Sequence, residues 1–213
     1  NKPDSNIVFT NSSLEIKGKY VINVAGLYSD KLAKINFKID YKIIPFRGEY
    51  YNLKPSAYHM VKNLIYPVPN PDFPFLGVHF TRRIDNSIES GPNAVFAFSR
   101  EGYKISTINL KELFESITYI GFLKLIKMYW KEGIVEIYRS LSKRAYLNSL
   151  QKLIPQIKIS DIVSGGAGVR AQAVKSNGQM VDDFLIISKN KIINVCNAPS
   201  PAATSSFAIG EHI

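Results

Sequence analysis

The pattern of apolar positions predicts two strands that lie near opposite ends of the chain. Residues 20–25 form a near-continuous apolar run that ends at Gly26, and residues 191–196 form a second run that ends at Cys196. Such runs are typical of parallel strands that are buried on both faces of a sheet. The pattern therefore predicts a parallel core whose two strands enclose most of the sequence between them.

The second apolar run leads into a corner of small residues. Residues 197–200 are predicted to turn, and residues 201–209 to form a helix in which Pro201 takes the first position and Ser200 is the cap. No bulky or charged side chain occupies residues 198–206, so a ligand could reach backbone N–H groups at the positive helix end. Such a corner suits a phosphate or a flavin carbonyl, although an ordinary packing corner gives the same pattern.

The segment between the two runs has the pattern of an antiparallel sheet. Residues 59–66 have strand character, and a proline-rich loop follows at residues 67–74. Residues 75–82 then alternate, which places His79 on one face of the strand and Phe80 on the other. We therefore expect at least two paired strands here.

Two shorter signals complete the predicted sheet. Asp85 and Asn86 suit a tight turn, from which residues 87–91 return as the partner strand. Residues 165–168 are rich in glycine, like a phosphate loop, but residues 169–174 continue as a strand where a phosphate loop would open a helix. We therefore expect a flexible entry to a strand at this point.

The region after the sheet is predicted to be helical. Apolar side chains recur at three- and four-residue spacing over residues 110–126, with Asn109 as a candidate N-cap. Gly133 is expected to divide the region, and the last helix should cover residues 143–154, because Pro155 ends it. The pattern as a whole predicts an α+β fold in which an antiparallel sheet with helices is inserted into an α/β core.

The predicted α/β core lacks one of its usual parts. No G-x-G-x-x-G motif follows a strand anywhere in the sequence, so the usual cradle for a pyrophosphate is absent. Two explanations remain open at this point. Either the chain binds no dinucleotide cofactor, or it is the C-terminal part of a longer protein.

Positive charge is concentrated in the helical region. The chain has a net charge of +10, and residues 104–158 hold ten Lys and Arg against four Glu, a net +6. A solvated helix face explains this pattern most simply. Peripheral contact with an anionic membrane through the helices of residues 109–154 is the alternative. Nucleic acid is not expected as a partner, because no nucleic-acid motif accompanies the charge.

Other features narrow the class of protein. No apolar run reaches the length of about eighteen residues that a membrane span requires, and the polar start of the chain is unlike a signal peptide. One cysteine and three scattered histidines offer no zinc-ligand spacing, and Cys196 is expected to be a small buried side chain. We therefore expect a cytoplasmic protein without a metal site, with a peripheral position at the inner membrane as the alternative.

Eight short blocks, in order along essentially the whole chain, resemble one family. The similarity is to the FAD-dependent D-amino-acid-oxidase-like superfamily, and within it to the members that oxidise L-2-hydroxyglutarate. The matching blocks are VINVAGLYSD (21–30), PFRGEY (45–50), LIYPVP (64–69), PFLGVHFTR (74–82), GPNAVFAFSREGY (91–103), AGVRAQAV (167–174), DDF (182–184) and CNAPSPAAT (196–204).

The resemblance implies a flavoenzyme of which this chain lacks the N-terminal glycine-rich unit. It implies that residues 1–40 belong to the FAD-binding domain and residues 41–160 to the substrate-binding domain. Residues 161–213 would return to the substrate sheet and then to the FAD-binding domain. The chain alone is then expected to bind FAD weakly or not at all and to be inactive. The alternatives are a related oxidoreductase for amino acids or glycerol 3-phosphate, and a non-catalytic basic module that docks on a membrane.

The resemblance also suggests roles for four polar side chains. Arg170 matches the family's carboxylate-binding arginine, a role that suits the planar guanidinium fork. His79 is the candidate base, since imidazole titrates near the working pH. Arg47, next to Gly48, is expected to line the flavin or the substrate, and Arg83 to bind the distal end of a dicarboxylate. Without the resemblance, surface arginines and a structural histidine would be the simpler interpretation.

For the cofactor, the resemblance implies two contact regions. Ala25 and Gly26 would let the flavin of FAD pack against backbone at a strand end. The corner would bring helix N–H groups near the flavin C2 carbonyl and stabilise negative charge on the reduced ring. The corner residues expected to contact the cofactor are Pro199, Ser200, Pro201, Ala202, Ala203 and Thr204. The sequence does not identify the electron acceptor.

Overall fold

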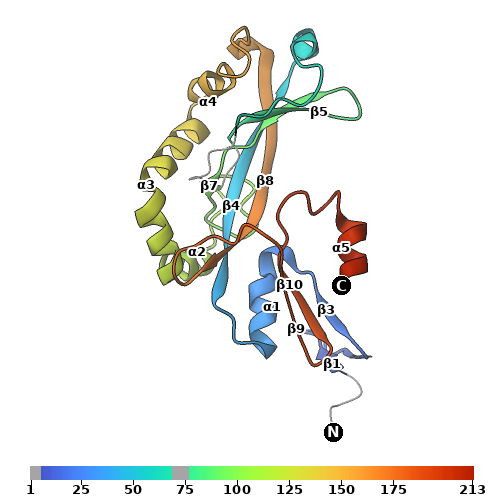
Figure 1. Cartoon of the computed structure of the whole chain (residues 1–213). Coiled ribbons are helices and arrows are strands. Elements are labelled where there is room, and N and C mark those ends of the chain that lie inside the picture. Colours follow the sequence, from blue (N-terminus) through green and yellow to red (C-terminus); the bar gives the residue numbers. More distant parts are fainter. Residues whose placement is uncertain (1–5, 69–76) are drawn as a thin grey trace.

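The computed structural model describes residues 6–68 and 77–213. The molecule is elongated, and a long two-stranded ladder forms its spine (Figure 1). The ladder consists of β4 (Tyr41–Leu53) and β8 (Ile162–Lys175), which pair antiparallel. Helices flank one side of the ladder, and a smaller sheet lies at its lower end (Figure 1). The mixed fold expected from the sequence, with an antiparallel sheet and several helices, is confirmed.

Three short strands complete the large sheet. They are β5 (His79–Arg82), β6 (Ile88–Gly91) and β7 (Val95–Phe96), and the order is β5-β6-β4-β7 with β8 also paired to β4. Residues 165–168 lie inside β8, where residues 166–168 pair with β4 and the register shifts at Gly165, so the expectation of a flexible entry before the strand was wrong. Gly166 has a left-handed φ of 95°, which glycine adopts without the steric penalty of a side chain, and it thereby accommodates the bulge in the ladder.

The predicted hairpin is confirmed. β5 and β6 pair antiparallel, and Asn86 in the turn adopts a left-handed φ of 64°. The Asp85 carboxylate accepts a hydrogen bond of 2.9 Å from the backbone N–H of Ser87, which is the local interaction that favours Asp in turns. Phe80 is fully buried and His79 is half-buried on the opposite face, as the alternation predicted.

The strand predicted at residues 59–66 is wrong in most of its length. Pro55–Met60 is a 3-10 helix, which proline at its first position favours, and Ile65 alone makes an isolated bridge to β5. Most of the proline-rich loop expected at residues 67–74, and the first two residues of the strand expected at residues 75–82, lie outside the described part of the chain.

The smaller sheet joins the two ends of the sequence. β3 (Val21–Asn23) pairs parallel with β10 (Ile192–Asn197), as predicted, and β9 (Leu185–Lys189) pairs antiparallel with the other side of β10. The expectation that the first strand is buried on both faces was wrong. β3 is an edge strand, and Ile22 and Val24 are 50% and 68% exposed.

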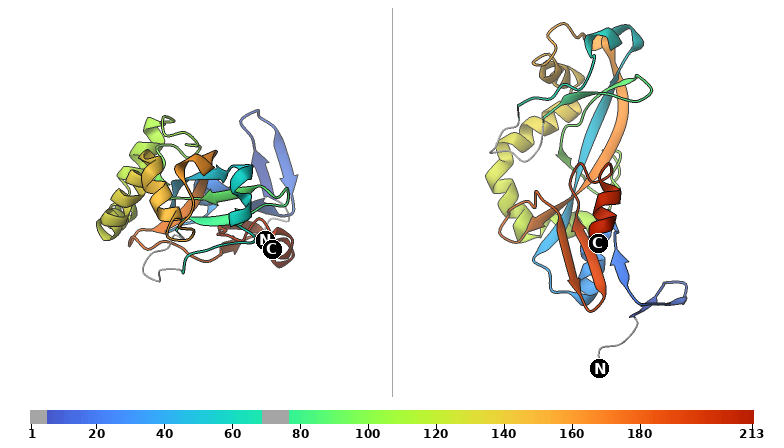
Figure 2. Two further views of the ribbon diagram at one scale, coloured as in Figure 1. Left: turned by 90° about the horizontal axis from the view of Figure 1, so that it is seen from above. Right: turned by 45° about the vertical axis from the view of Figure 1, so that its right-hand side comes forward.

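A separate hairpin precedes this sheet. It consists of β1 (Asn6–Phe9) and β2 (Glu15–Gly18), and it projects away from the rest of the molecule (Figure 2). The helix α1 (Ser29–Asn36) packs against β10 and the start of β4, between the two sheets (Figure 1).

The corner after β10 differs from the prediction. Residues 201–205 form turns, and the helix α5 (Ser206–His212) begins only at Ser206, so the helix start predicted at Pro201 with Ser200 as its cap was wrong. The Thr204 hydroxyl donates a hydrogen bond of 2.9 Å to the Pro201 carbonyl. Hydroxyl side chains that bond the local backbone in this way favour turns over a regular helix.

The helical region contains three helices: α2 (Leu110–Ile117), α3 (Ile120–Leu141) and α4 (Lys143–Leu150). The predicted cap is confirmed, because the Asn109 side chain accepts a hydrogen bond from Glu112 N–H at 3.2 Å. Two boundaries were wrong. Gly133 does not divide α3, whose irregular residue is Tyr129, and α4 ends before residue 154. Within the described residues, none of the helices is both long enough and apolar enough to cross a bilayer.

Three apolar clusters hold these elements together. One lies between α4, the 3-10 helix and the upper end of the large sheet, around Phe80 and Tyr146. The second lies between α3 and the ladder, around Ile44 and Phe122. The third joins the large sheet to the smaller one and includes Cys196, which is 2% exposed as predicted. The junction between the two sheets is therefore a packed core.

A buried ion pair fastens the same junction. Asp30 of α1 and Arg100 are 1% and 3% exposed, and two nitrogens of the guanidinium lie 2.7 and 2.9 Å from the two carboxylate oxygens. Asp30 also accepts a hydrogen bond of 3.1 Å from the backbone N–H of Ile43 in β4. The pair therefore links α1 to β4 and to the loop after β7.

We expect Asp30→Asn to lower the free energy of unfolding by about 3–5 kcal/mol, because it leaves the Arg100 guanidinium buried without a counter-charge. Urea unfolding of the purified protein measures this change. Glu132→Gln, at an exposed site on α3, is the matched control and should change stability by less than about 0.5 kcal/mol. Equal effects of the two substitutions would contradict a role for the ion pair at the junction.

Candidate functional site

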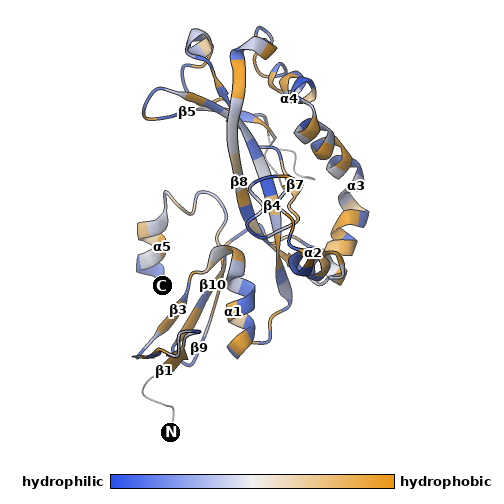
Figure 3. Cartoon of the chain, turned by 180° about the vertical axis from the view of Figure 1, so that it is seen from behind, coloured by the Kyte–Doolittle hydropathy of each residue, from blue (hydrophilic) through white to orange (hydrophobic). Residues whose placement is uncertain are grey.

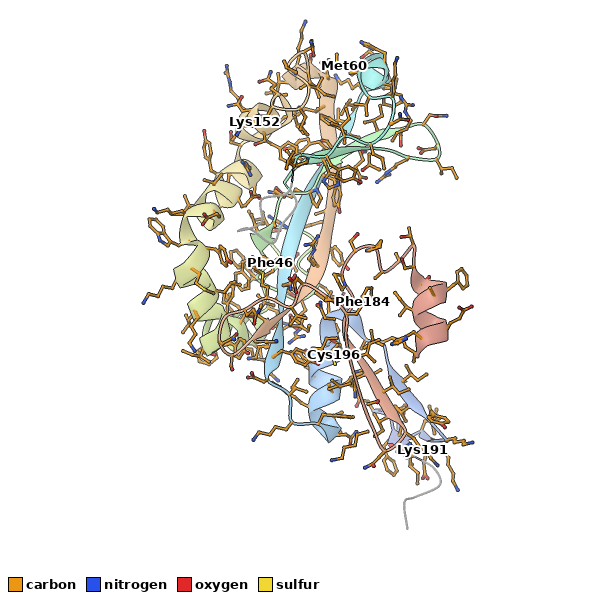
Figure 4. All side chains as sticks on the ribbon, viewed as in Figure 1. Phe46, Met60, Lys152, Phe184, Lys191 and Cys196 are labelled. Atoms are coloured by element: carbon orange, nitrogen blue, oxygen red, sulfur yellow. The ribbon has the colours of Figure 1, made fainter. Side chains whose placement is uncertain are left out.

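The candidate site lies where the ladder passes the corner after β10. Figure 4 shows Phe46 of β4 and Cys196 of β10 in this region. Two cavities meet there. We call the first the histidine cavity: it has a volume of about 550 Å³ and is lined by residues that include Tyr50, Tyr66, His79, Arg170, Pro199 and Ser200. We call the second the corner cavity: it has a volume of about 560 Å³ and is lined by residues that include Gly26, Arg170, Cys196, Pro199, Ser200 and Ala202.

Arg170 lines both cavities. It lies on β8 directly opposite Phe46 of β4, and its side chain is exposed to solvent in this chain. Protein around the guanidinium lowers the pKa of Arg170 below its ordinary value, while the hydroxyl of Tyr50 acts in the opposite direction. An arginine stays charged under any condition in which the protein is folded. The site therefore presents a fixed positive charge where the two cavities meet.

His79 faces the same cavity from the first position of β5. Its Nδ1 atom lies 3.1 Å from the carbonyl oxygen of Gly77, and its ring stacks on that of Tyr66 with centroids 4.6 Å apart. Burial lowers the pKa of His79 below 6.5, and the positive charge of Arg170 lowers it further, although the Gly77 carbonyl acts in the opposite direction. The neutral imidazole is therefore the favoured form near neutral pH.

The contact with Gly77 determines which nitrogen of His79 is free. A carbonyl oxygen can only accept a hydrogen bond, so Nδ1 must carry the proton in this contact. In the neutral ring Nε2 then has a lone pair. His79 is thereby set as a proton acceptor through Nε2.

Two of the expected arginines do not reach this cavity. Arg47 is 4% exposed, pairs with Glu49 at 3.0 Å and contacts the Ser140 hydroxyl at 3.3 Å, in a separate cavity beside α3. Successive strand residues point to opposite faces, so Arg47 points away from the face of its neighbour Gly48. Arg83 pairs with Glu89 on the neighbouring strand.

The structure therefore does not place these two arginines with His79 and Arg170. Among the described residues that line the histidine cavity, Arg170 is the one side chain with a permanent positive charge. The second cation expected for a dicarboxylate is not among them.

The structure also adds residues to which sequence reasoning gave no role. Tyr66, Tyr50, Asn93 and Asp182 line the histidine cavity. Tyr66 precedes the proline-rich loop, and its position over His79 depends on the bridge between Ile65 and β5. A signal in the sequence existed, because Tyr66 lies within one of the blocks that resemble the family. The pairing that brings it to His79 could not be derived from that block alone.

Some of the residues that were expected to contact the cofactor line the corner cavity. Gly26, Pro199, Ser200 and Ala202 line it, whereas Ala25 and residues 201, 203 and 204 are not among its lining residues. Gly26 has a left-handed φ of 50°, and no atom lies within 4 Å of the position that a Cβ would take. A flat ring could therefore pack against this backbone. The predicted approach of N–H groups at a helix start does not apply to Pro201, because α5 begins later.

Comparison with known proteins matches the chain to one family of oxidoreductases and to relatives that share one name. The sequence model of the family described as "DAO: FAD dependent oxidoreductase" matches residues 6–213. The L-2-hydroxyglutarate dehydrogenase of Indibacter alkaliphilus is 57% identical over 89% of this chain and 48% of its own length. The human mitochondrial enzyme of that name is 48% identical over 92% of the chain and 43% of its own length. The Escherichia coli K12 protein of that name is 42% identical over 97% of this chain and 49% of its own length. The chain thus spans about half the length of the curated relatives it matches.

A solved structure resembles the fold. It is the dithionite-reduced L-alpha-glycerophosphate oxidase of Mycoplasma pneumoniae with FAD bound. The TM-score is 0.60 at 19% sequence identity, and the match covers 98% of this chain and 45% of that one. At this identity the likeness concerns the fold, and it again covers about half of the larger protein.

Proposed function

The chain belongs to the family of FAD-dependent oxidoreductases, and from this premise we propose that it forms about half of an enzyme that oxidises L-2-hydroxyglutarate to 2-oxoglutarate. One observation carries the proposal: Arg170, His79 and the corner residues Pro199 and Ser200 line a single cavity. The names of relatives at 42–57% identity supply the substrate.

The same proposal assigns the two sheets to two domains. The small sheet, with residues 1–40 and the end of the chain, is proposed to be the remainder of the FAD-binding domain. Strands β4 to β7 of the large sheet with α2, α3 and α4, over residues 41–160, are proposed to bind the substrate. Residues 161–213 return through β8 to the small sheet. The junction between the sheets, where both cavities open, is where cofactor and substrate would meet.

The residues of the corner cavity fit a flavin. Most of their side chains are small or apolar, with Arg170, Gln172 and Asn197 as the larger polar ones, and Gly26 leaves open space beside its backbone. Gly26, Pro199, Ser200 and Ala202 would hold the ring. When bound, FAD supplies the acceptor for the hydride that leaves the α-carbon of the substrate.

The remaining steps fall to residues of this chain. The Arg170 guanidinium would hold the substrate carboxylate by two parallel hydrogen bonds and so fix the α-carbon at the meeting point of the cavities. His79 Nε2 would take the proton of the 2-hydroxyl group as the carbon–hydrogen bond breaks. The alcohol thus loses one hydride and one proton and becomes a ketone. Burial is the main cause that lowers the pKa of His79, and the charge of Arg170 adds to it, so the carboxylate clamp also favours the neutral base.

The full-length protein, with its N-terminal half, tests the proposal. We expect anaerobic bleaching of its flavin by L-2-hydroxyglutarate. The comparison substrates are D-2-hydroxyglutarate, L-malate, L-glutamate and glycerol 3-phosphate, and bleaching by these should be much slower. Faster reduction by L-glutamate or glycerol 3-phosphate would replace the proposed substrate by the corresponding alternative. A protein that purifies without flavin and binds none would overturn the proposal.

A second, compatible role is proposed from the outer face of α2 and α3. Figure 3 shows hydrophobic positions along both helices. Several large apolar side chains on these helices are 45% or more exposed, and lysines lie among them, whereas Phe122 and Leu125 face the core. The apolar members include Leu110, Phe114, Leu123, Met128, Tyr138 and Leu141, and the lysines are Lys111, Lys124, Lys127 and Lys131. Apolar side chains among positive charges complement an anionic lipid surface, so we propose peripheral membrane contact through this face.

We expect the full-length protein to sediment with vesicles of phosphatidylcholine and phosphatidylglycerol, but not with phosphatidylcholine alone. Reversing Lys124, Lys127 and Lys131 to Glu should weaken vesicle binding by roughly 100-fold or more, since each lysine near an anionic surface contributes about 1 kcal/mol. The matched control reverses Lys62, Lys158 and Lys189, which are exposed elsewhere. Equal losses in both triple variants would indicate a net-charge effect and contradict docking through α2 and α3.

A further inference from the structure

We infer that Tyr66 is a positioning residue for the reaction, which holds the imidazole of His79 with Nε2 available as the proton acceptor. The inference rests on the proposed function. It concerns a side chain that lies outside the buried core, because Tyr66 is 46% exposed. Its contact is with the ring of the proposed base.

The backbone fixes Tyr66 opposite His79. Two hydrogen bonds join Ile65 and Phe80, one of 3.0 Å from Ile65 N–H and one of 2.9 Å from Phe80 N–H. In this antiparallel bridge, the residue after Ile65 faces the residue before Phe80. Tyr66 and His79 are therefore cross-strand neighbours, and their side chains lie on the same face.

The two rings are in stacking contact. Their centroids are 4.6 Å apart and their planes differ by 22°. On the edge of the imidazole, Nδ1 is held by the Gly77 carbonyl at 3.1 Å. Stacking restricts the tilt of the ring and the hydrogen bond restricts its rotation. With both contacts present, Nε2 is the nitrogen that remains for a substrate proton.

Tyr66 also shields one face of the imidazole from water. Burial is the main cause that keeps the pKa of His79 low. Among the residues that the structure describes, the other titratable or charged side chains that line the cavity are Tyr50 on β4, Arg170 on β8 and Asp182 after β8. Arg170 is the one whose charge acts on His79, and it lowers the pKa as well. Removal of the Tyr66 ring therefore changes the solvation of His79 without changing any of these charges.

The test is the pH dependence of L-2-hydroxyglutarate oxidation by the full-length enzyme. The base must be neutral, so kcat/KM rises with pH through the pKa of His79. In Tyr66→Leu the shielding ring is lost, and this rise should move to higher pH, toward the ordinary histidine value of 6.5. We also expect kcat to fall by roughly tenfold, comparable to the loss of an aromatic pair. Tyr66→Phe keeps the ring and should retain the wild-type profile.

Two controls separate this role from general damage. Tyr103→Leu removes a tyrosine that is similarly exposed, at 51%, and outside the histidine cavity, and it should leave the profile unchanged. Tyr66→Trp restores a stacking ring and should restore the wild-type profile if the leucine variant folds poorly. An unshifted profile in a folded Tyr66→Leu enzyme would overturn the positioning role alone. A wild-type enzyme that does not oxidise L-2-hydroxyglutarate would instead overturn the proposed function.

Discussion

Arg170→Met in the full-length enzyme should lower kcat/KM for L-2-hydroxyglutarate by roughly 1,000-fold. The estimate follows from two charge-assisted hydrogen bonds of about 2 kcal/mol each between the guanidinium and the substrate carboxylate. Methionine is similar in length and keeps the apolar part of the side chain, so β8 should be undisturbed. Most of the loss should be in KM, because the carboxylate is held in the ground state as well as in the transition state. Steady-state kinetics with a saturating electron acceptor measures both constants.

Two further variants make this test specific. Arg170→Lys keeps the charge but loses the planar fork, and it should fall between wild type and Arg170→Met. Arg83→Met removes an arginine that the sequence also suggested, but that pairs with Glu89 outside the cavity. It should leave KM within about twofold of wild type. If Arg83→Met raised KM as much as Arg170→Met did, the cavity would not be the carboxylate site.

The parts of the fold predicted correctly from the sequence are those that local interactions determine. Asn109 caps α2 through a backbone group three residues away, and Asp85 bonds a backbone N–H two residues away. The alternation at residues 78–80 needs only the pleat of a strand. In each case the atoms that decide the structure are close together in sequence.

The predictions that differ from the structure concern features that depend on residues far apart in sequence. Arg47 was expected near the ligand, but its direction is decided by the register of β4 and by Ser140, which is 93 residues away in sequence. The apolar run of β3 suggested burial on both faces, yet β3 is the edge of its sheet here. That pattern fits a chain that spans about half the length of its relatives.

The candidate site could be predicted from the sequence in part only, because its residues were identified by resemblance but their meeting depends on contacts between distant parts of the chain. The resemblance identified Arg170 and His79, and their meeting with Pro199 and Ser200 in one cavity required the topology. β8 brings Arg170 beside β4, and the hairpin of β5 and β6, on the other side of β4, brings His79 to the same cavity. Residues 201–205 form turns because Thr204 bonds the local backbone, a competition that apolar periodicity does not reveal.

His79→Asn should lower kcat by roughly 10²–10⁴-fold, the range in which a positioned general base contributes. Asparagine is the matched substitution, because its amide nitrogen takes the place of Nδ1 and can still donate to the Gly77 carbonyl. The variant therefore keeps the contact but loses the proton acceptor. KM should change little, since Arg170 still holds the carboxylate, and the rise of kcat/KM with pH through the histidine pKa should disappear. The flavin absorption spectrum, unchanged from wild type, serves as the control for folding. A variant that kept the wild-type pH profile at lower kcat would show that another group accepts the proton, and Tyr50, which lines the same cavity, would be the next residue to replace.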